Sequence, residues 1–161
     1  MNIRKCFFAI SVALLMTASM AVRSSFADNA PEGILGSWVV AITEGPGTPD
    51  LPVWYRAHVT FVPGGGLVAS ITDPLLTTGH GSWARLTGNA LAITILLSQF
   101  SAQGEFLGTL KARATLKLDR RTDKFSSDDY QFEFFDPNGQ PTGFVGTGLA
   151  HGTRIKVEKL H

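Results

Sequence analysis

The sequence contains one adjacent pair of side chains that could do chemistry inside a pocket, Arg56 and His58. Both lie on the polar side of the alternating run from Trp54 to Val62. A guanidinium beside an imidazole could bind an anionic or carbonyl group and exchange a proton with it. The alternative is that both side chains are solvated, because the polar face of a half-buried strand commonly faces water. The pair supports an enzyme only if it points into a pocket beside Trp54.

The other candidates for catalysis or metal binding are scattered along the chain. His80 lies between two glycines in a predicted loop, and His151 lies near the end of the last predicted strand. The histidines lack the close spacing from which three or four converging metal ligands are usually built. The sequence also lacks a Gly-x-Ser-x-Gly motif, a phosphate-binding glycine loop and a His-Glu-x-x-His motif. We therefore predict no catalytic residue, no metal ion and no cofactor.

Residues 1–27 have the pattern of a secretory signal peptide. Arg4 and Lys5 precede an apolar run from Phe7 to Val22, and small residues in Ser25–Ala27 predict cleavage before Asp28. The apolar run is short for a bilayer span, which needs about 20 residues. We expect a secreted or periplasmic protein with no membrane span after cleavage. The cysteine, Cys6, would leave with the leader.

The charge balance of residues 28–161 argues against nucleic acid as a partner. The whole chain has 14 Lys and Arg against 13 Asp and Glu, and three of the basic residues lie in the leader. Removing the leader leaves 11 against 13, a net charge of −2. A mildly acidic domain has no basic surface for phosphate backbones. The remaining 134 residues are enough for one domain with its own core.

Residues 28–161 are predicted to form short strands and no helix. The clearest strand is 108–118, in which leucines and alanines alternate with Lys111, Arg113 and Lys117. This period of two is typical of a half-buried antiparallel strand. Repeated glycines in the last strand mark tight bending or the close approach of another segment. The predicted strands are 34–43, 54–62, 67–72, 81–86, 91–100, 108–118, 125–135 and 144–155.

The two ends of the predicted strand series are expected to be neighbours. Gly36-Ser37-Trp38 opens the first strand, and Gly152-Thr153-Arg154 closes the last. Closing the sheet into a barrel removes both exposed edges and pairs the first strand with the last. The guanidinium of Arg154 would then lie over the indole of Trp38. We predict an all-β fold, a single eight-stranded antiparallel up-and-down barrel.

This plan resembles the calycin group, which includes lipocalins, fatty-acid-binding proteins and avidins. Gly36, Trp38 and Arg154 match that group as a structural signature and not as a binding site, while the other short lipocalin motifs are not evident. The resemblance implies a lipocalin-like barrel. The plan is also similar to allene-oxide-cyclase-like and dirigent-like barrels, which would imply a cyclase or isomerase, although no catalytic residue can be matched.

An eight-stranded barrel is just wide enough to be filled by side chains or to hold one small ligand. Its aromatic residues could form the core or line a pocket: Trp54, Tyr55, Phe61, Trp83, Phe100, Phe132 and Phe134. We expect a small hydrophobic ligand such as an acyl chain, terpenoid or aromatic metabolite. The alternatives are a cyclase or isomerase of a hydrophobic metabolite, or a filled barrel that serves as an interaction module. The predicted ligand-binding residues are Trp54, Arg56, His58, Trp83, Arg113 and Phe132. Arg56 or Arg113 could anchor a carboxylate at the rim if its strand turns that side chain toward the pocket.

Overall fold

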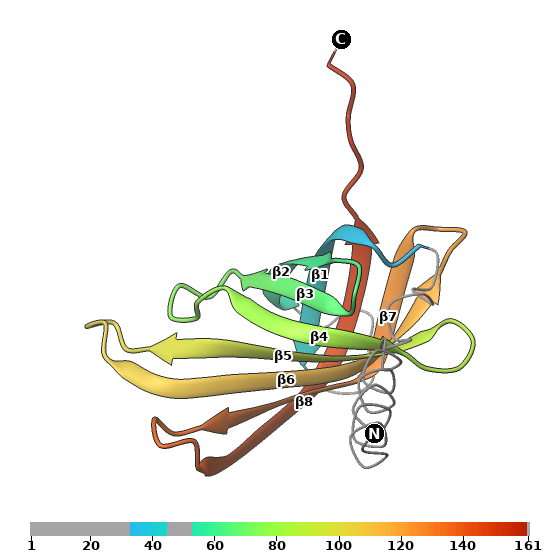
Figure 1. The fold of residues 1–161 in the computed structure, drawn as a ribbon. Helices are drawn as coiled ribbons and strands as arrows, with labels where there is room; N and C mark the ends of the chain where they lie inside the picture. Colours follow the sequence, from blue (N-terminus) through green and yellow to red (C-terminus); the bar gives the residue numbers. More distant parts are fainter. Residues whose placement is uncertain (1–32, 45–52, 161) are drawn as a thin grey trace, which may run out of the picture.

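The computed structural model describes residues 33–44 and 53–160, which form a closed antiparallel barrel of eight strands in chain order (Figure 1). This confirms the predicted fold class, and the strand bounds agree with the prediction to within three residues. The predicted signal peptide lies outside the described residues. Within them, no helix is long and apolar enough to cross a membrane. The strands are β1 Gly36–Glu44, β2 Val53–Phe61, β3 Gly66–Ile71, β4 Gly79–Arg85, β5 Ala90–Phe100, β6 Phe106–Asp119, β7 Lys124–Phe135 and β8 Pro141–Arg154.

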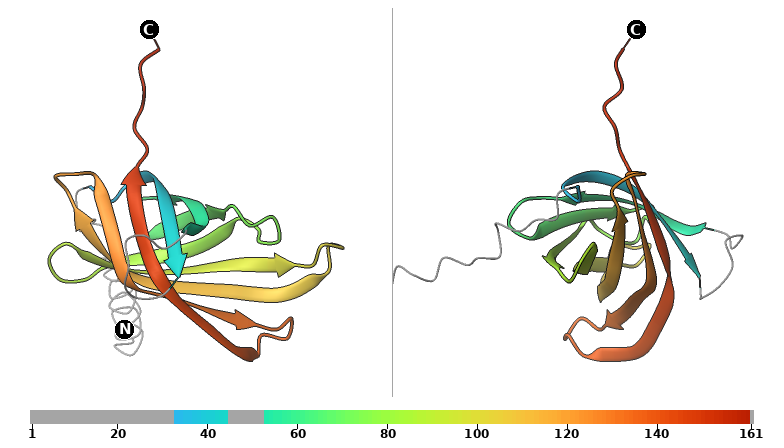
Figure 2. Two further views of the ribbon diagram at one scale, coloured as in Figure 1. Left: turned by 180° about the vertical axis from the view of Figure 1, so that it is seen from behind. Right: turned by 90° about the vertical axis from the view of Figure 1, so that its right-hand side faces the viewer.

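The barrel closes where β1 pairs with β8, and these two strands run side by side in Figure 2. Trp38 and Arg154 are direct partners in this register. The guanidinium carbon of Arg154 lies 4.4 Å from the centre of the Trp38 ring, as the sequence predicts. Gly36 has a φ of 109°, and a Cβ there would lie 3.1 Å from the guanidinium. A glycine is therefore required at this position.

The strands differ in length, and this gives the barrel one tall wall. β5, β6, β7 and β8 have 11, 14, 12 and 14 residues, whereas β2, β3 and β4 have 9, 6 and 7. The β5–β6 and β7–β8 hairpins therefore extend past the end of β2 and β3 (Figure 1). This end of the barrel is called the open end, and the end that holds Trp38 is called the closed end.

The interior is packed in layers along the barrel axis. At the closed end, aromatic rings lie against one another: the ring centres of Trp38 and Phe125 are 5.1 Å apart, and those of Phe61 and Trp83 are 6.5 Å apart. Aliphatic side chains fill the middle layer because every second residue of each strand points inward. This layer is lined by Val40, Ala57, Val59, Ala69, Ile93, Ile95, Leu97, Ala112, Ala114 and Leu116.

The glycines of β8 make room for aromatic rings of β7. Phe132 is the register partner of Gly146, and Phe125 is the register partner of Gly152. A Cβ on either glycine would lie 2.1–2.2 Å from atoms of the facing ring. The repeated glycines therefore mark close approach, one of the two explanations that the sequence offers. They let large rings on one strand come close to the neighbouring backbone.

A β-bulge at Asp128 and Asp129 changes which residues of β7 point inward. The register of β7 shifts here against both β6 and β8. Phe125 and Ser127 are buried before the bulge, and Tyr130 is buried after it. The Asp129 Oδ1 accepts hydrogen bonds from the Thr115 backbone N–H at 2.7 Å and the Ser127 hydroxyl at 2.9 Å. The carboxylate thus replaces a ladder bond that the extra residue breaks.

Candidate functional site

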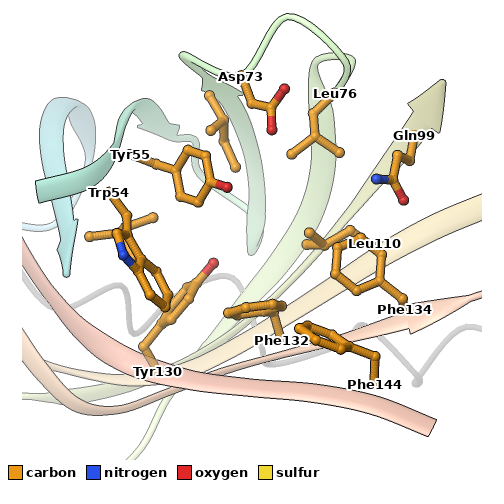
Figure 3. A pocket seen from close by; sticks show the side chains of 12 residues that line it. Trp54, Tyr55, Asp73, Leu76, Gln99, Leu110, Tyr130, Phe132, Phe134 and Phe144 are labelled. Atoms are coloured by element: carbon orange, nitrogen blue, oxygen red, sulfur yellow. The ribbon is translucent and has the colours of Figure 1, made fainter. Parts of the chain in front are cut away.

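A pocket of about 430 Å³ lies at the open end, between the tall wall and the shorter strands (Figure 3). It is called the aromatic pocket because six of its twelve lining residues carry aromatic rings. A cavity of this size falls within the range of small-molecule sites, about 300–1,000 Å³. The lining residues are Ile42, Trp54, Tyr55, Ile71, Asp73, Leu76, Gln99, Leu110, Tyr130, Phe132, Phe134 and Phe144.

Two consecutive aromatic residues of β2 line the pocket, although strict alternation would send them to opposite faces. The pairing of β1 with β2 explains this, because Ile42 pairs with Tyr55 while Thr43 pairs with Val53. Trp54 is the extra residue at this irregularity. The local bend lets the side chains of both Trp54 and Tyr55 border the pocket (Figure 3).

The tall wall contributes a continuous set of rings. The bulge in β7 places Tyr130 and Phe132 on its inward face, followed by Phe134, and β8 adds Phe144. The ring centres of Phe132 and Phe134 are 5.9 Å apart, and those of Phe134 and Phe144 are 5.5 Å apart. Phe144 is 57% exposed. A cluster of rings that is left partly open to solvent is typical of a binding surface.

The polar groups of the pocket are few and converge on its space. The hydroxyls of Tyr55 and Tyr130 point into it, and Asp73 and Gln99 border its rim (Figure 3). Burial, with a smaller effect of Tyr55, raises the pKa of Tyr130 to about 12. The Tyr130 phenol therefore stays protonated near neutral pH and can donate a hydrogen bond into the pocket.

The barrel interior beneath the aromatic pocket is filled. A second cavity there measures only about 40 Å³, and its lining is mostly aliphatic. Ile42, Ile71 and Tyr130 border both spaces. Side chains therefore fill the middle and the closed end of the described barrel, and room for a ligand exists at the open end.

The structure brings together only two of the predicted binding residues, Trp54 and Phe132. Trp83 points inward but lies at the closed end, where its Nε1 donates to the Val62 carbonyl at 3.2 Å. Trp83 therefore does not line the aromatic pocket. The period of two predicts which face of a strand a residue takes and not its height along the barrel axis.

The three predicted cationic groups also lie away from the pocket. Arg56 and His58 are exposed on the face of β2 opposite the buried Ala57 and Val59. Arg113 lies on the outer face of β6, where it donates to the Gln131 side chain at 3.1 Å. Neither arginine lines the aromatic pocket, because these side chains occupy the polar faces of their strands.

The predicted set of binding residues omits several that the structure places at the pocket. Tyr55 and Phe134 were detectable, since alternation puts both on apolar strand faces, and both are among the aromatic candidates. Tyr130 was hidden by the bulge that precedes it. Asp73 and Phe144 come from a loop and from an irregular strand end, and nothing in their local sequence marks them as neighbours of the others.

Among the described residues, no three His, Cys, Asp or Glu side chains are grouped closely enough to hold a metal ion. Comparison of the chain with protein-family models, with curated proteins and with solved structures found no match. Fold and site together define the class: an eight-stranded up-and-down antiparallel barrel, compatible with a calycin-like architecture, with an aromatic pocket at one end.

Proposed function

We propose that this protein binds a small hydrophobic molecule in the aromatic pocket. The observation that carries the proposal is a space of about 430 Å³ lined by six aromatic rings. Burying apolar ligand surface against such rings gains about 25 cal/mol per Å². The tyrosine hydroxyls at the pocket offer a few oriented polar contacts, which is the usual composition of a small-molecule site.

We further propose that the protein is exported and that its barrel is of the calycin type. The leader pattern in residues 1–27 supports export to a secreted or periplasmic location. The pairing of Trp38 with Arg154 across the closing strands supports the calycin assignment. Sequencing the N-terminus of the protein purified from its own host tests export, with Asp28 as the expected first residue.

The alternative of a cyclase or isomerase receives less support from the site. Its only candidate pair, Arg56 and His58, lies on the outer face of β2. The alternative of a filled barrel fits the middle and closed layers but leaves the open end unexplained, since the aromatic pocket is not filled by the described residues.

Trp54 provides an internal reporter for the binding test. The chain has three tryptophans, and only Trp54 borders the aromatic pocket, while Trp38 and Trp83 are buried at the closed end. Hydrophobic ligands such as fatty alcohols and terpenoids should change the tryptophan emission of the wild type. Trp54→Phe should remove that change while ligand is still detected by native mass spectrometry. If no apolar ligand alters the emission or co-purifies with the protein, the proposal is wrong.

A further inference from the structure

We infer that the aromatic pocket prefers a hydrophobic cation, such as an amine or quaternary ammonium with an apolar body, over a hydrophobic anion, and that Asp73 sets this preference. The inference rests on the proposed function, because it assigns the charge of the ligand that this site takes. It replaces the sequence-based expectation of a carboxylate held by arginine.

The first support is the charge of the lining. Among the described residues that line the aromatic pocket, Asp73 is the only ionisable side chain apart from the two tyrosines, and none is a lysine, arginine or histidine. A ligand carboxylate would lose its hydration next to the negative charge of Asp73 and would find no cationic partner, which is unfavourable. An ammonium group would instead meet an opposite charge.

The second support is the chemistry of the opposite wall. Asp73 follows β3, and the rings of Phe132 and Phe134 belong to β7. In a closed ring of eight strands, β3 and β7 face each other across the barrel. The face of an aromatic ring carries partial negative charge and attracts cations. An ammonium group in this space is therefore attracted both by a carboxylate and by the surrounding rings.

The third support is that Asp73 is held in place. Its Oδ1 accepts a hydrogen bond from the Leu75 backbone N–H at 2.9 Å, and its carbonyl accepts one from the Leu76 N–H at 3.2 Å. This Asx turn fixes the side chain at the rim and leaves Oδ2 available for a ligand. An asparagine can make the same turn through its side-chain oxygen, so Asp73→Asn removes the charge while keeping the local hydrogen bond.

The test uses three probes that share one chain: octylammonium, 1-octanol and octanoate. Their dissociation constants for the wild type at neutral pH are measured by tryptophan emission and by calorimetry. We expect octylammonium to bind at least about tenfold more tightly than octanoate at low salt. High salt should reduce this preference, because ions screen a charge at the rim, while 1-octanol binding stays unchanged.

Asp73→Asn should reduce the preference to about threefold or less, with 1-octanol binding retained. The matched control is Asp119→Asn, which removes the same charge from a residue that also caps a turn, but at the closed end. Asp119→Asn should keep the wild-type preference. Asp73→Ser, which also retains a capping oxygen, serves as a second variant if Asp73→Asn does not fold.

The outcomes separate this inference from the proposed function. If 1-octanol binds but octanoate binds as tightly as octylammonium, the inference is wrong and the proposed function stands. The inference is equally overturned if the preference for the cation persists in Asp73→Asn. If none of the three probes binds the folded wild type, the proposed function fails and the inference fails with it.

Discussion

The side chains of Trp38 and Arg154 jointly hold the residue 33–35 segment across the closed end of the barrel. The Trp38 Nε1 donates to the Ile34 carbonyl at 2.9 Å, and Arg154 Nη1 donates to the Leu35 carbonyl at 2.7 Å. A second guanidinium nitrogen donates to the Gly33 carbonyl. Asp123 holds the guanidinium from the other side, with its Oδ1 3.1 Å from Nε. One cation therefore joins the first strand, the last strand and the lead-in segment.

Arg154→Ala should lower the free energy of unfolding by about 2–3 kcal/mol, because it removes charge-assisted hydrogen bonds from partly buried carbonyls. Arg154→Lys should rescue little of this loss, since an ammonium lacks the planar fork that reaches several partners. Urea denaturation gives both values. Arg56→Ala, an exposed arginine on the outer face, is the control and should change stability by less than about 0.5 kcal/mol. Equal losses in the two alanine variants would contradict the assigned role.

Gly152→Ala should destabilise the protein by about 1–3 kcal/mol, because its Cβ would overlap the ring of Phe125. Phe125→Leu alone should also destabilise, through lost packing at the closed end. The double variant should lose less stability than the sum of the two single losses, since the smaller side chain at position 125 gives the new methyl group room. Thermal or urea unfolding of the four proteins measures this coupling, and strict additivity would disprove the contact.

Asp129→Asn should alter how stability depends on pH. Burial opposes ionisation of Asp129, but its hydrogen bonds to Thr115 and Ser127 outweigh it and lower the pKa. The ionised carboxylate thus contributes stability that is complete above the unfolded pKa of about 3.9 and is lost as pH falls through the lower folded pKa.

The urea midpoints of wild type and Asp129→Asn should therefore differ most above about pH 5 and converge in acid. Asp128→Asn is the neighbouring control, because Asp128 forms an exposed ion pair with Lys117 at 2.7 Å. Such an exposed pair contributes little to stability, because water screens the two charges. A constant difference between wild type and Asp129→Asn at every pH would refute the role of the charge.

Phe144→Ala should weaken binding of hydrophobic ligands by about fivefold to a hundredfold, as loss of an aromatic contact costs about 1–3 kcal/mol. Its effect on stability should be small, because the ring is 57% exposed. Phe106→Ala is the matched control, since Phe106 is 44% exposed but does not line the pocket. Calorimetric titration and urea unfolding separate the two effects. Equal affinity losses in both variants would place the ligand elsewhere.

Tyr130→Phe should make the fold more resistant to alkali. The pKa of Tyr130 is raised to about 12 by burial, so the folded state disfavours the ionised phenol. Its contribution to stability is complete below the unfolded pKa of about 10 and is lost as pH rises through the folded value. The chain has two tyrosines, so the difference between the ultraviolet titrations of the wild type and Tyr130→Phe isolates the ionisation of Tyr130. If Tyr130 ionises near its ordinary pKa of about 10 in the folded wild type, this account is overturned.

The sequence by itself determined the architecture and the faces of the strands. The alternation in residues 54–62 and 108–118 sorted Ala57 and Val59, or Ala112 and Ala114, to the inside, because a side-chain period of two is a local property of extended backbone. The joining of Trp38 and Arg154 followed from the need to hide two sheet edges. Alternation also placed Arg56 and Arg113 on the polar faces of their strands, where both side chains are exposed.

Tertiary structure alone decided where the pocket lies and which residues meet there. Alternation does not predict the height of a residue along the barrel axis, so Trp54 and Trp83 were both predicted to bind the ligand. Strand register places them at opposite ends of the barrel. The bulges at Trp54 and at Asp128–Asp129 shift the alternation by one residue, and their position depends on the partner strands. Asp73 faces the rings of β7 because the stagger of the strands sets which residues lie at the same height across the ring, and no local pattern encodes that stagger.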